Sequence, residues 1–177
     1  DVAREVRQLC GAGFREVVLS GVHLGSWGQD LVPRRGLPDL VHHVLEVTDI
    51  ERLRLSSVEP WDLTDDFFEL YRDARVLPHL HLPLQSGCDA TLRRMARRTT
   101  RREFEHLMRH ARSVVPEMSI STDVIVGFPG ETEADFRETL ALVEAVGYGQ
   151  AYSFKYSARP GTPAAEREDV PEAEKSE

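Results

Sequence analysis

The chain has 177 residues, of which 41% are hydrophobic and 29% are charged, and its formal net charge is −8. These values are typical of one globular domain with a substantial core, and no run of about eighteen apolar residues is present to span a membrane. The negative charge excludes indiscriminate nucleic-acid binding by the whole surface, and the only cysteines, Cys10 and Cys88, fit free thiols in a reducing, cytoplasmic compartment.

Strands and helices alternate along the chain, with short connections between them. A β-then-α order predicts parallel strands covered by helices, which is an α/β fold. The expected helices cover residues 2–11, 37–45, 64–73 and 89–97, one that starts at Thr100 and is stopped by Pro116, and one from 132 to 146. The expected strands cover residues 16–22, 52–57, 79–84, 119–126 and 150–156.

Local signals fix the ends of two helices. Thr100-x-x-Glu103 is a capping-box pattern, and Thr132-x-x-Asp135 opens the helix that follows a β-branched strand and a glycine/proline turn. Gly147 suits the C-terminal end of that second helix. The turn before it therefore belongs to a strand–loop–helix unit, the place where α/β enzymes build their sites.

Side-chain alternation gives most strands one apolar and one polar face. Helices should cover the apolar faces, which include the leucines of strand 79–84 and Tyr152, Phe154 and Tyr156 of the last strand. The polar faces would then line a wet interior, so we expect an incomplete parallel barrel with a central cavity. The residues on the polar faces include Arg54, Ser56, His79, His81, Gln85, Ser121, Asp123, Ser153, Lys155 and Ser157.

Five segments at strand ends carry a recognisable order of residues. They read Leu19-Ser-Gly-Val-His-Leu-Gly-Ser-Trp-Gly28, Arg54-Leu-Ser-Ser-Val-Glu-Pro60, His79-Leu-His-Leu-Pro-Leu-Gln-Ser-Gly87, Asp123-Val-Ile-Val-Gly-Phe-Pro-Gly-Glu-Thr132 and Phe154-Lys-Tyr-Ser-Ala-Arg-Pro-Gly-Thr-Pro-Ala-Ala165. Together they resemble the radical S-adenosylmethionine core of the tRNA methylthiotransferases, over residues 1 to about 165.

The resemblance implies a partial parallel (β/α) barrel of the radical SAM type that lacks its first strand and its cluster loop. Residues 1–165 would be strands two to six of that core. Residues 166–177, which are charged and contain proline, would be a linker toward a C-terminal RNA-binding domain. The family binds S-adenosylmethionine and 4Fe–4S clusters. We expect the cluster ligands to lie outside this chain, because Cys10 and Cys88 lack the family's spacing.

The resemblance also assigns contacts to the cofactor at the strand ends. The segment Ser20–His23, which includes Gly21, would bind the methionine amino group. Ser56, Ser57 and Glu59, which follow the next strand, would bind polar atoms of the methionine part. Gln85 and Ser86 would meet ribose hydroxyls or the carboxylate, and Ile125 with Gly127 would form the adenine platform. The predicted cofactor residues are Ser20, Gly21, His23, Ser56, Ser57, Glu59, Gln85, Ser86, Asp123, Ile125, Gly127, Lys155 and Ser157, and Arg159 is predicted to contact substrate phosphate or the cofactor carboxylate.

Other roles compete for some of these residues. Ser and Gly at strand ends are common in turns, and Glu131 beside a helix N-terminus can be purely structural. Asp123 and Lys155 both point inward by alternation, so they can simply pair with each other. His79 and His81 form a His-x-His that some hydrolases use for metal, although polar packing in the cavity explains them as well.

Six arginines form the densest charge run in this acidic chain. They are Arg93, Arg94, Arg97, Arg98, Arg101 and Arg102. Parts of the run make a basic stripe at helical spacing, which suits a phosphate backbone, while a solvated face with acidic partners such as Glu105 is the alternative. No aromatic residues are interleaved, so base stacking is not supported here.

The function implied by the resemblance is addition of a methylthio group to a modified adenosine beside the tRNA anticodon, by radical chemistry. The fragment alone would be inactive. Partners would be tRNA, through the full-length protein, and an electron donor such as flavodoxin or ferredoxin. Residues 21–28 and 79–87 look like the threonylcarbamoyladenosine branch, whereas residues 151–162 and 169–172 look like the isopentenyladenosine branch. A ribosomal-protein aspartate methylthiotransferase, a metal-dependent barrel hydrolase and an RNA-binding module are the alternatives.

Overall fold

The computed structural model describes residues 1–167 and 170–176. Its contacts divide the chain into two units, which are residues 1–82 with 110–120 and residues 83–109 with 121–177. The sheets have the strand orders β1-β2 and β3-β4-β5. No helix in the described part of the chain is both long enough and apolar enough to cross a membrane.

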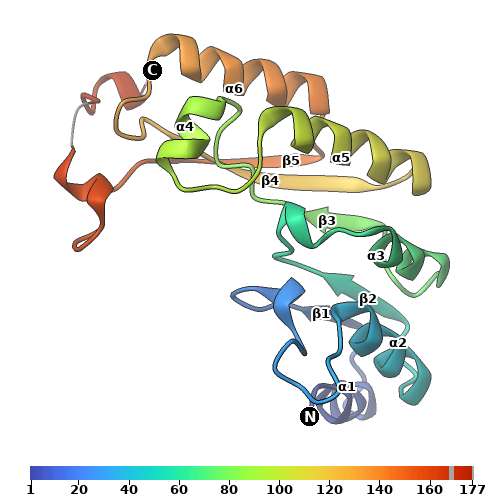
Figure 1. Ribbon diagram of the computed structural model, residues 1–177. Helices are drawn as coiled ribbons and strands as arrows, with labels where there is room; N and C mark the ends of the chain where they lie inside the picture. Colours follow the sequence, from blue (N-terminus) through green and yellow to red (C-terminus); the bar gives the residue numbers. More distant parts are fainter. Residues whose placement is uncertain (168–169, 177) are drawn as a thin grey trace. The chain divides into compact units, whose positions relative to one another are not determined.

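The first unit is built on a short parallel pair of strands (Figure 1). Strands β1 (Glu16–Leu19) and β2 (Arg52–Leu55) pair in parallel along their whole length, and Leu53 and Leu55 are completely buried. The other elements of this unit are α1 (Val2–Gly11), η1 (Leu24–Ser26), α2 (Leu37–Val47), η2 (Pro60–Asp62), α3 (Asp65–Glu69), η3 (Leu70–Arg72) and β3 (His79–His81).

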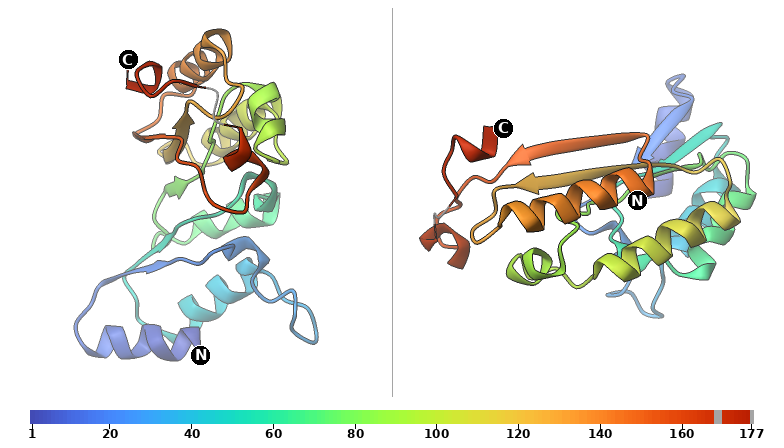
Figure 2. Two further views of the ribbon diagram at one scale, coloured as in Figure 1. Left: turned by 90° about the vertical axis from the view of Figure 1, so that its left-hand side faces the viewer. Right: turned by 90° about the horizontal axis from the view of Figure 1, so that it is seen from above.

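The second unit is centred on β4 (Ser119–Val126) and β5 (Gln150–Lys155), which are parallel. Helix α6 (Glu133–Val146) lies along one face of this strand pair (Figure 2) and buries Leu142 and Val146. The remaining elements are α4 (Asp89–Arg94), η4 (Pro163–Glu166), η5 (Glu174–Ser176) and α5 (Arg101–Val114), which begins in this unit and ends in the first.

Every helix and strand expected from the sequence is present, and the prediction of an α/β fold with parallel strands in an incomplete arrangement is confirmed. Several elements are shorter than expected. Strand β3 stops at His81, close to Pro83, whose ring nitrogen cannot donate to a ladder. The expected helix at 64–73 tightens into a 3₁₀ turn at Leu70.

The two predicted capping boxes and the predicted helix end at Gly147 are confirmed. The Thr132 hydroxyl accepts the Asp135 amide at 3.2 Å while the Asp135 carboxylate accepts the Thr132 amide at 3.1 Å. Thr100 and Glu103 make the equivalent pair of bonds, at 3.3 and 2.8 Å. Gly147 adopts the left-handed conformation (φ 61°, ψ 65°) that a helix C-terminus commonly needs.

The prediction for the faces of the last strand is wrong. The register aligns Tyr152 with Asp123 and Phe154 with Ile125, so these aromatic side chains share the face on which Asp123 lies. Lys155 aligns with Val126 and therefore points to the opposite side, which excludes the expected inward pairing of Asp123 with Lys155. Alternation sets which residues of a strand share a face, but the register with the neighbouring strand decides which face it is.

Candidate functional site

A pocket of about 780 Å³ lies within the second unit, beside the carboxyl end of β4 and β5. This volume is within the range of about 300–1,000 Å³ that small-molecule sites occupy. Apolar side chains, including Ile125, Phe128 and Phe154, form much of its wall. The predicted site residues that the structure brings together in this wall are Gln85, Asp123, Ile125, Lys155, Ser157 and Arg159.

Gln85 is held in the pocket wall by its backbone. Its amide donates to the Asp123 carbonyl at 2.8 Å, and its carbonyl accepts the Ile125 amide at 2.9 Å. These bonds hold Gln85 at φ 70°, and Ala96, also in the wall, has φ 55°. Residues other than glycine rarely adopt such values, and they concentrate at functional sites. The backbone at Gln85, for which the sequence predicts a ligand contact, is therefore held in a rarely adopted conformation at the rim of the pocket.

The aromatic side chains of β5 are open to a ligand. Phe154 is 53% exposed although it lies in the pocket wall on the same face as Ile125. An edge strand has one neighbour only, so its large side chains stay uncovered unless something else packs on them. A flat apolar group that lies over Ile125 and Phe154 would cover both.

Arg97 is a pocket residue that the predicted site residues did not include. Its Nη2 atom donates to the Pro83 carbonyl at 3.0 Å, and its side chain lines the pocket together with Arg159. In the sequence Arg97 appeared only as one member of the arginine run. The helical spacing of that run did not separate the arginine that faces a cavity from those that face solvent.

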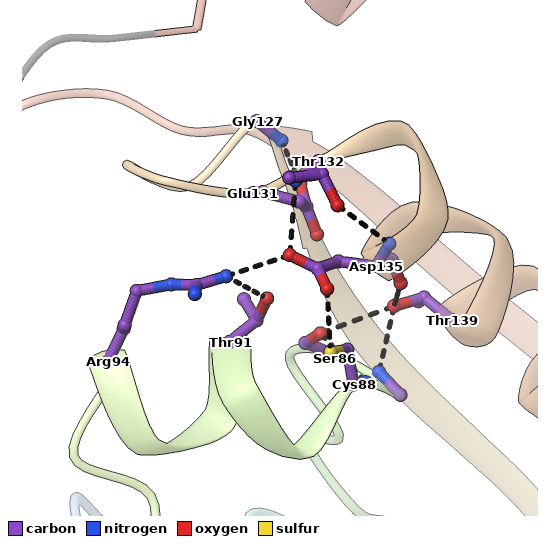
Figure 3. Close-up of polar contacts among 10 residues, drawn as sticks. Ser86, Cys88, Thr91, Arg94, Gly127, Glu131, Thr132, Asp135 and Thr139 are labelled. Atoms are coloured by element: carbon purple, nitrogen blue, oxygen red, sulfur yellow. Dashed lines mark hydrogen bonds and ion pairs between the residues drawn. The ribbon is translucent and has the colours of Figure 1, made fainter.

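A hydrogen-bonded network centred on Asp135 fixes the segments behind the pocket (Figure 3). The Asp135 carboxylate accepts bonds from the Cys88 thiol at 3.1 Å and from Arg94 at 3.0 Å, in addition to its capping bond. Burial acts to raise the pKa of Asp135, but the bonds from Thr132, Cys88 and Arg94 outweigh it, so this pKa lies below its ordinary value.

Cys88 is a free thiol, as expected, and it is buried. Burial raises its pKa, and the neighbouring Asp135 carboxylate raises it further, while backbone amides of the next helical turn act in the opposite direction. A protonated thiol can donate to Asp135, which a thiolate cannot. Cys88 therefore serves as a hydrogen-bond donor that helps to join α4 to the start of α6 (Figure 3).

Ser86 does not fit the ribose or carboxylate contact expected for it. The residue is 0% exposed, and its hydroxyl bonds to the Thr139 hydroxyl and the Cys88 amide, each at 3.2 Å. The Gly87 amide donates to the same Thr139 oxygen at 2.9 Å. A buried hydroxyl needs hydrogen-bond partners inside the protein. Ser86 finds one in Thr139 of α6, so the loop that carries Ser86 and Gly87 packs against this helix.

Gly127 is covered by the end of the chain rather than by a cavity. It has φ 72°, and a Cβ atom built on it would lie 2.4 Å from Cγ of Lys175, whose side chain is only 4% exposed. The Lys175 ammonium lies 5.7 Å from the centre of the Tyr156 ring, and Glu172 pairs with Lys155 at 3.0 Å. The expected adenine platform therefore keeps Ile125 in the pocket wall, but not Gly127.

Glu131 has the structural role that was one of its two interpretations. Its carboxylate accepts the Gly127 amide at 2.6 Å and closes the turn between β4 and α6 (Figure 3). Burial raises the pKa of Glu131, and the amides of Gly127 and Phe128 oppose this shift.

Tyr156 places a polar atom at the pocket that the protein does not satisfy. Its hydroxyl oxygen is buried and has no hydrogen-bond partner among residues 1–167 and 170–176, while its ring packs edge-on against Phe128 at 5.1 Å. Tyr156 and Phe128 both line the pocket. Because buried hydroxyls normally find partners, a polar ligand atom beside Tyr156 is a chemically reasonable complement.

The remaining predicted residues lie in the first unit, after β1 and β2. Ser20, Gly21 and His23 follow β1, and the Ser56 amide donates to the Leu19 carbonyl at 3.0 Å, which joins the two strand ends. Ser57, at φ 63°, is another non-glycine residue in the left-handed region. These residues, with Glu59, stay predictions.

His23 has a defined partner at the same strand end. Its Nε2 atom lies 3.0 Å from Oδ2 of Asp62, and a Cβ atom on Gly25 would lie 2.1 Å from that oxygen. The ring also meets Trp61 edge-on, with ring centres 6.5 Å apart. Gly25 therefore leaves the space in which Asp62 orients the imidazole.

His79 and His81 occupy β3, where both are partly buried. Burial lowers the pKa of His79, and the positive Arg54 and His81 lower it further, so a neutral imidazole is favoured. In the described ranges, 1–167 and 170–176, no three His, Cys, Asp or Glu side chains gather in a way that suits a metal ion.

Comparison with known proteins links this chain to one large group of enzymes. Residues 1–143 match the model of the radical SAM superfamily. A tRNA-2-methylthio-N(6)-dimethylallyladenosine synthase of Cereibacter sphaeroides is 44% identical over 94% of this chain, and one of Clostridium tetani is 41% identical over 97%. The chain spans 38% of the length of each of these relatives.

A solved structure supports the same fold. The radical S-adenosylmethionine methyltransferase TsrM from Kitasatospora setae, with cobalamin and a 4Fe–4S cluster bound, superimposes with a TM-score of 0.70. The match covers 93% of this chain and 32% of that one, at 18% sequence identity. At this identity the likeness concerns the fold alone.

Proposed function

Because this chain belongs to the radical SAM superfamily, we propose that its 780-Å³ pocket binds S-adenosylmethionine. The observation that carries the proposal is the gathering of Gln85, Asp123, Ile125 and Arg159, all predicted from sequence, in one wall. An adenosine group needs an apolar slot for its ring and polar partners for its ribose, and this wall offers both.

Within the pocket, the geometry suggests a place for each part of the ligand. Adenine would lie over Ile125 and Phe154, which are side by side on one face of β4 and β5. The Asp123 carboxylate would accept hydrogen bonds from the ribose hydroxyls, and the Gln85 amide group would donate to them or accept from them. The buried Tyr156 hydroxyl and Ser157 would complete the polar contacts.

The charged side chains would orient the amino-acid part of the ligand. Arg97 and Arg159 provide guanidinium groups suited to a carboxylate, and Arg97 is already fixed by the Pro83 carbonyl. Lys155 also lines the pocket, but its ammonium is bonded to Glu172 and Ser176, so no ligand contact is proposed for it. Ser20, Gly21, His23, Ser56, Ser57 and Glu59 belong to the first unit, are not assigned to this pocket, and stay predictions from the sequence. When bound, the cofactor supplies the radical chemistry, and the protein positions it and excludes water.

For the whole protein we propose a tRNA methylthiotransferase, of which this chain is the central part. Residues 1–165 would form the radical SAM core, and residues 166–177 would lead toward an RNA-binding segment. The relatives support this proposal because each is named as such an enzyme and is more than twice as long as this chain. Ligands for 4Fe–4S clusters and docking of an electron donor such as flavodoxin or ferredoxin are assigned to the other segments.

The names of these relatives favour dimethylallyladenosine, which is isopentenyladenosine, as the modified base. The threonylcarbamoyladenosine branch was suggested by residues 21–28 and 79–87. Analysis of tRNA nucleosides from cells that lack the gene would decide between them. Loss of the methylthio group from dimethylallyladenosine alone is expected, and its loss from threonylcarbamoyladenosine instead would contradict the proposed substrate.

The cofactor pocket can be tested by binding alone, with the 177-residue chain and S-adenosylhomocysteine in isothermal titration calorimetry. Asp123→Ala is expected to weaken binding by about tenfold, because one hydrogen bond to a charged group contributes roughly 1.5–3 kcal/mol. Glu133→Ala, on the exposed surface of α6, is the control and should leave binding unchanged. Absence of saturable binding by the unmodified chain would refute the assignment of the pocket.

A further inference from the structure

The structure separates the arginine run into members with internal partners and members without them. Arg94 bonds to Asp135, and Arg97 bonds to the Pro83 carbonyl and lines the pocket. Arg101 pairs with Glu105 at 2.9 Å. By contrast, Arg102 forms no ion pair with any residue of the described ranges, 1–167 and 170–176. Arg93 and Arg98 also have no ion pair within those ranges, but they precede α5, whereas Arg102 lies on the exposed side of α5.

That side of α5 carries a hollow of about 470 Å³ with a cationic lining. Arg102, His106 and Arg109 line it at the i, i+4, i+7 spacing that places residues on one helix face, and all three are exposed. Within the described part of the chain, Arg109 also has no ion pair. Seven residues of helix put these guanidinium groups on a stretch of about 10 Å along the axis.

One acidic side chain and no large apolar side chain share this surface with the cations. Glu103 shares the hollow, but its carboxylate is occupied by the Thr100 amide and hydroxyl, both at 2.8 Å. Those bonds lower the pKa of Glu103 and keep it charged and fixed at the helix start. No large apolar side chain lines the hollow, in contrast to the centre of a protein–protein interface, which is enriched in aromatic residues.

We propose that the hollow formed by Arg102, His106 and Arg109 binds the phosphodiester backbone of RNA. This inference rests on the proposed function, since it supplies a contact for the RNA that carries the modified adenosine. Backbone binding requires only cations and hydrogen-bond donors spaced along a surface, and the lining provides little else. It also explains how an acidic chain with net charge −8 presents a local attraction for RNA.

The test measures binding of an unmodified tRNA transcript to the 177-residue chain by fluorescence anisotropy between 0.05 and 0.5 M salt, roughly the range in which phosphate contacts are salt-sensitive. For Arg102→Gln/Arg109→Gln the slope of log K against log salt should become shallower by about 1.4, with binding about 25-fold weaker at 0.1 M salt. The matched control is Arg101→Gln/Arg137→Gln, which removes the same charge from ion-paired positions of α5 and α6. It should change binding less than about threefold.

Several results would overturn the proposal. These are equal weakening by the two double variants, no weakening by either, absence of RNA binding by the unmodified chain, or displacement of the RNA by polyglutamate as efficiently as by polyuridylate. S-adenosylhomocysteine binding, measured on the same samples, separates this inference from the proposed function. Arg102→Gln/Arg109→Gln should leave that binding intact, so loss of RNA binding alone identifies the hollow on α5. Retained cofactor binding with no effect on RNA would refute the hollow and leave the pocket assignment standing.

Discussion

Single residues in this protein act by connecting segments that are far apart in the sequence. Asp135 is the clearest case, because its one carboxylate accepts hydrogen bonds from the Thr132 amide at the start of α6, from the Cys88 thiol and from Arg94 (Figure 3). Ser86 and Thr139 make a second connection between the same segments. Of these side chains only Arg94 lines the pocket, so the position of the Gln85 rim depends largely on residues outside the pocket wall.

The first prediction concerns Asp135→Asn. The folded-state pKa of Asp135 lies below its ordinary value of about 3.9, so its stabilising effect is complete above that value and is lost as the pH falls through the folded-state pKa. At pH 7 the substitution should lower the free energy of unfolding by about 2 kcal/mol, because it weakens bonds to a charged acceptor. Urea unfolding at pH 7 and pH 3 measures the difference, which should be smaller at pH 3. An equal loss at both pH values would contradict this account.

A second residue-scale prediction concerns Cys88. Because the thiol is buried and its pKa is raised, alkylation by iodoacetamide at pH 8 should be much slower at Cys88 than at the half-buried Cys10. Mass spectrometry of the alkylated peptides gives both rates in one sample. Asp135→Asn removes the charged acceptor and should speed alkylation of Cys88 while leaving Cys10 unchanged. Comparable rates at the two thiols of the unmodified chain would show that Cys88 is accessible.

At the scale of elements, the helices are fixed at their ends by short-range chemistry, and the strands are fixed by their neighbours. Thr132 and Asp135 satisfy amides at the start of α6, and Gly147 ends it in a left-handed conformation. Helix α6 is the element that covers the β4–β5 pair in the second unit (Figure 2). The N-terminus of α6 therefore fixes the end of the turn that runs from Gly127 to Glu131.

Thr132→Ala tests this element directly. Loss of the hydroxyl leaves the Asp135 amide without its acceptor, which should cost about 1 kcal/mol and lower the Tm by about 2–4 °C for a chain of this size. Thr132→Ser keeps the oxygen and should restore most of the loss. Thermal unfolding followed by circular dichroism gives both values, and equal Tm values for the two variants would rule out a capping role.

At the scale of the whole molecule, residues 170–176 pack against the segment that contains Gly127 and against Lys155. Lys175 covers Gly127, and Glu172 holds Lys155, which points away from the Asp123 face of the sheet. Residues 170–176 therefore pack on the segment that carries the turn between β4 and α6. The α/β core and this docked segment belong to the same unit.

Gly127→Ala should release this segment. A methyl group at φ 72° is strained, and it would also lie 2.4 Å from Cγ of Lys175. Amide hydrogen exchange of peptides from residues 170–176 should become at least about tenfold faster, while exchange in the centre of α6 should change little. Gly161→Ala, at φ 82° with open space around it, is the control for backbone strain alone. Slow exchange retained in Gly127→Ala would show that Lys175 is not what holds the segment.

The sequence was sufficient for the features that depend on near neighbours. The capping boxes at Thr100 and Thr132, the helix end at Gly147 and the buried leucines of residues 80–84 were predicted because hydrogen bonding and alternation act over a few residues. Strand-end motifs also placed Gln85, Asp123, Ile125 and Arg159 together, since carboxyl ends of parallel strands meet at one edge.

Only the tertiary structure decided which side each of these features faces. The register of β5 on β4 turned Phe154 toward Ile125 and Lys155 away, and packing against Thr139 buried Ser86. The tertiary structure also determines that Arg97 lines the pocket, whereas Arg102 lies on the exposed face of α5. Alternation along a strand or periodic spacing along a helix shows which residues share a face, but it does not show which side of the element packs against the core. The face is selected by contacts between residues distant in the chain, whose burial and hydrogen bonding no local pattern contains.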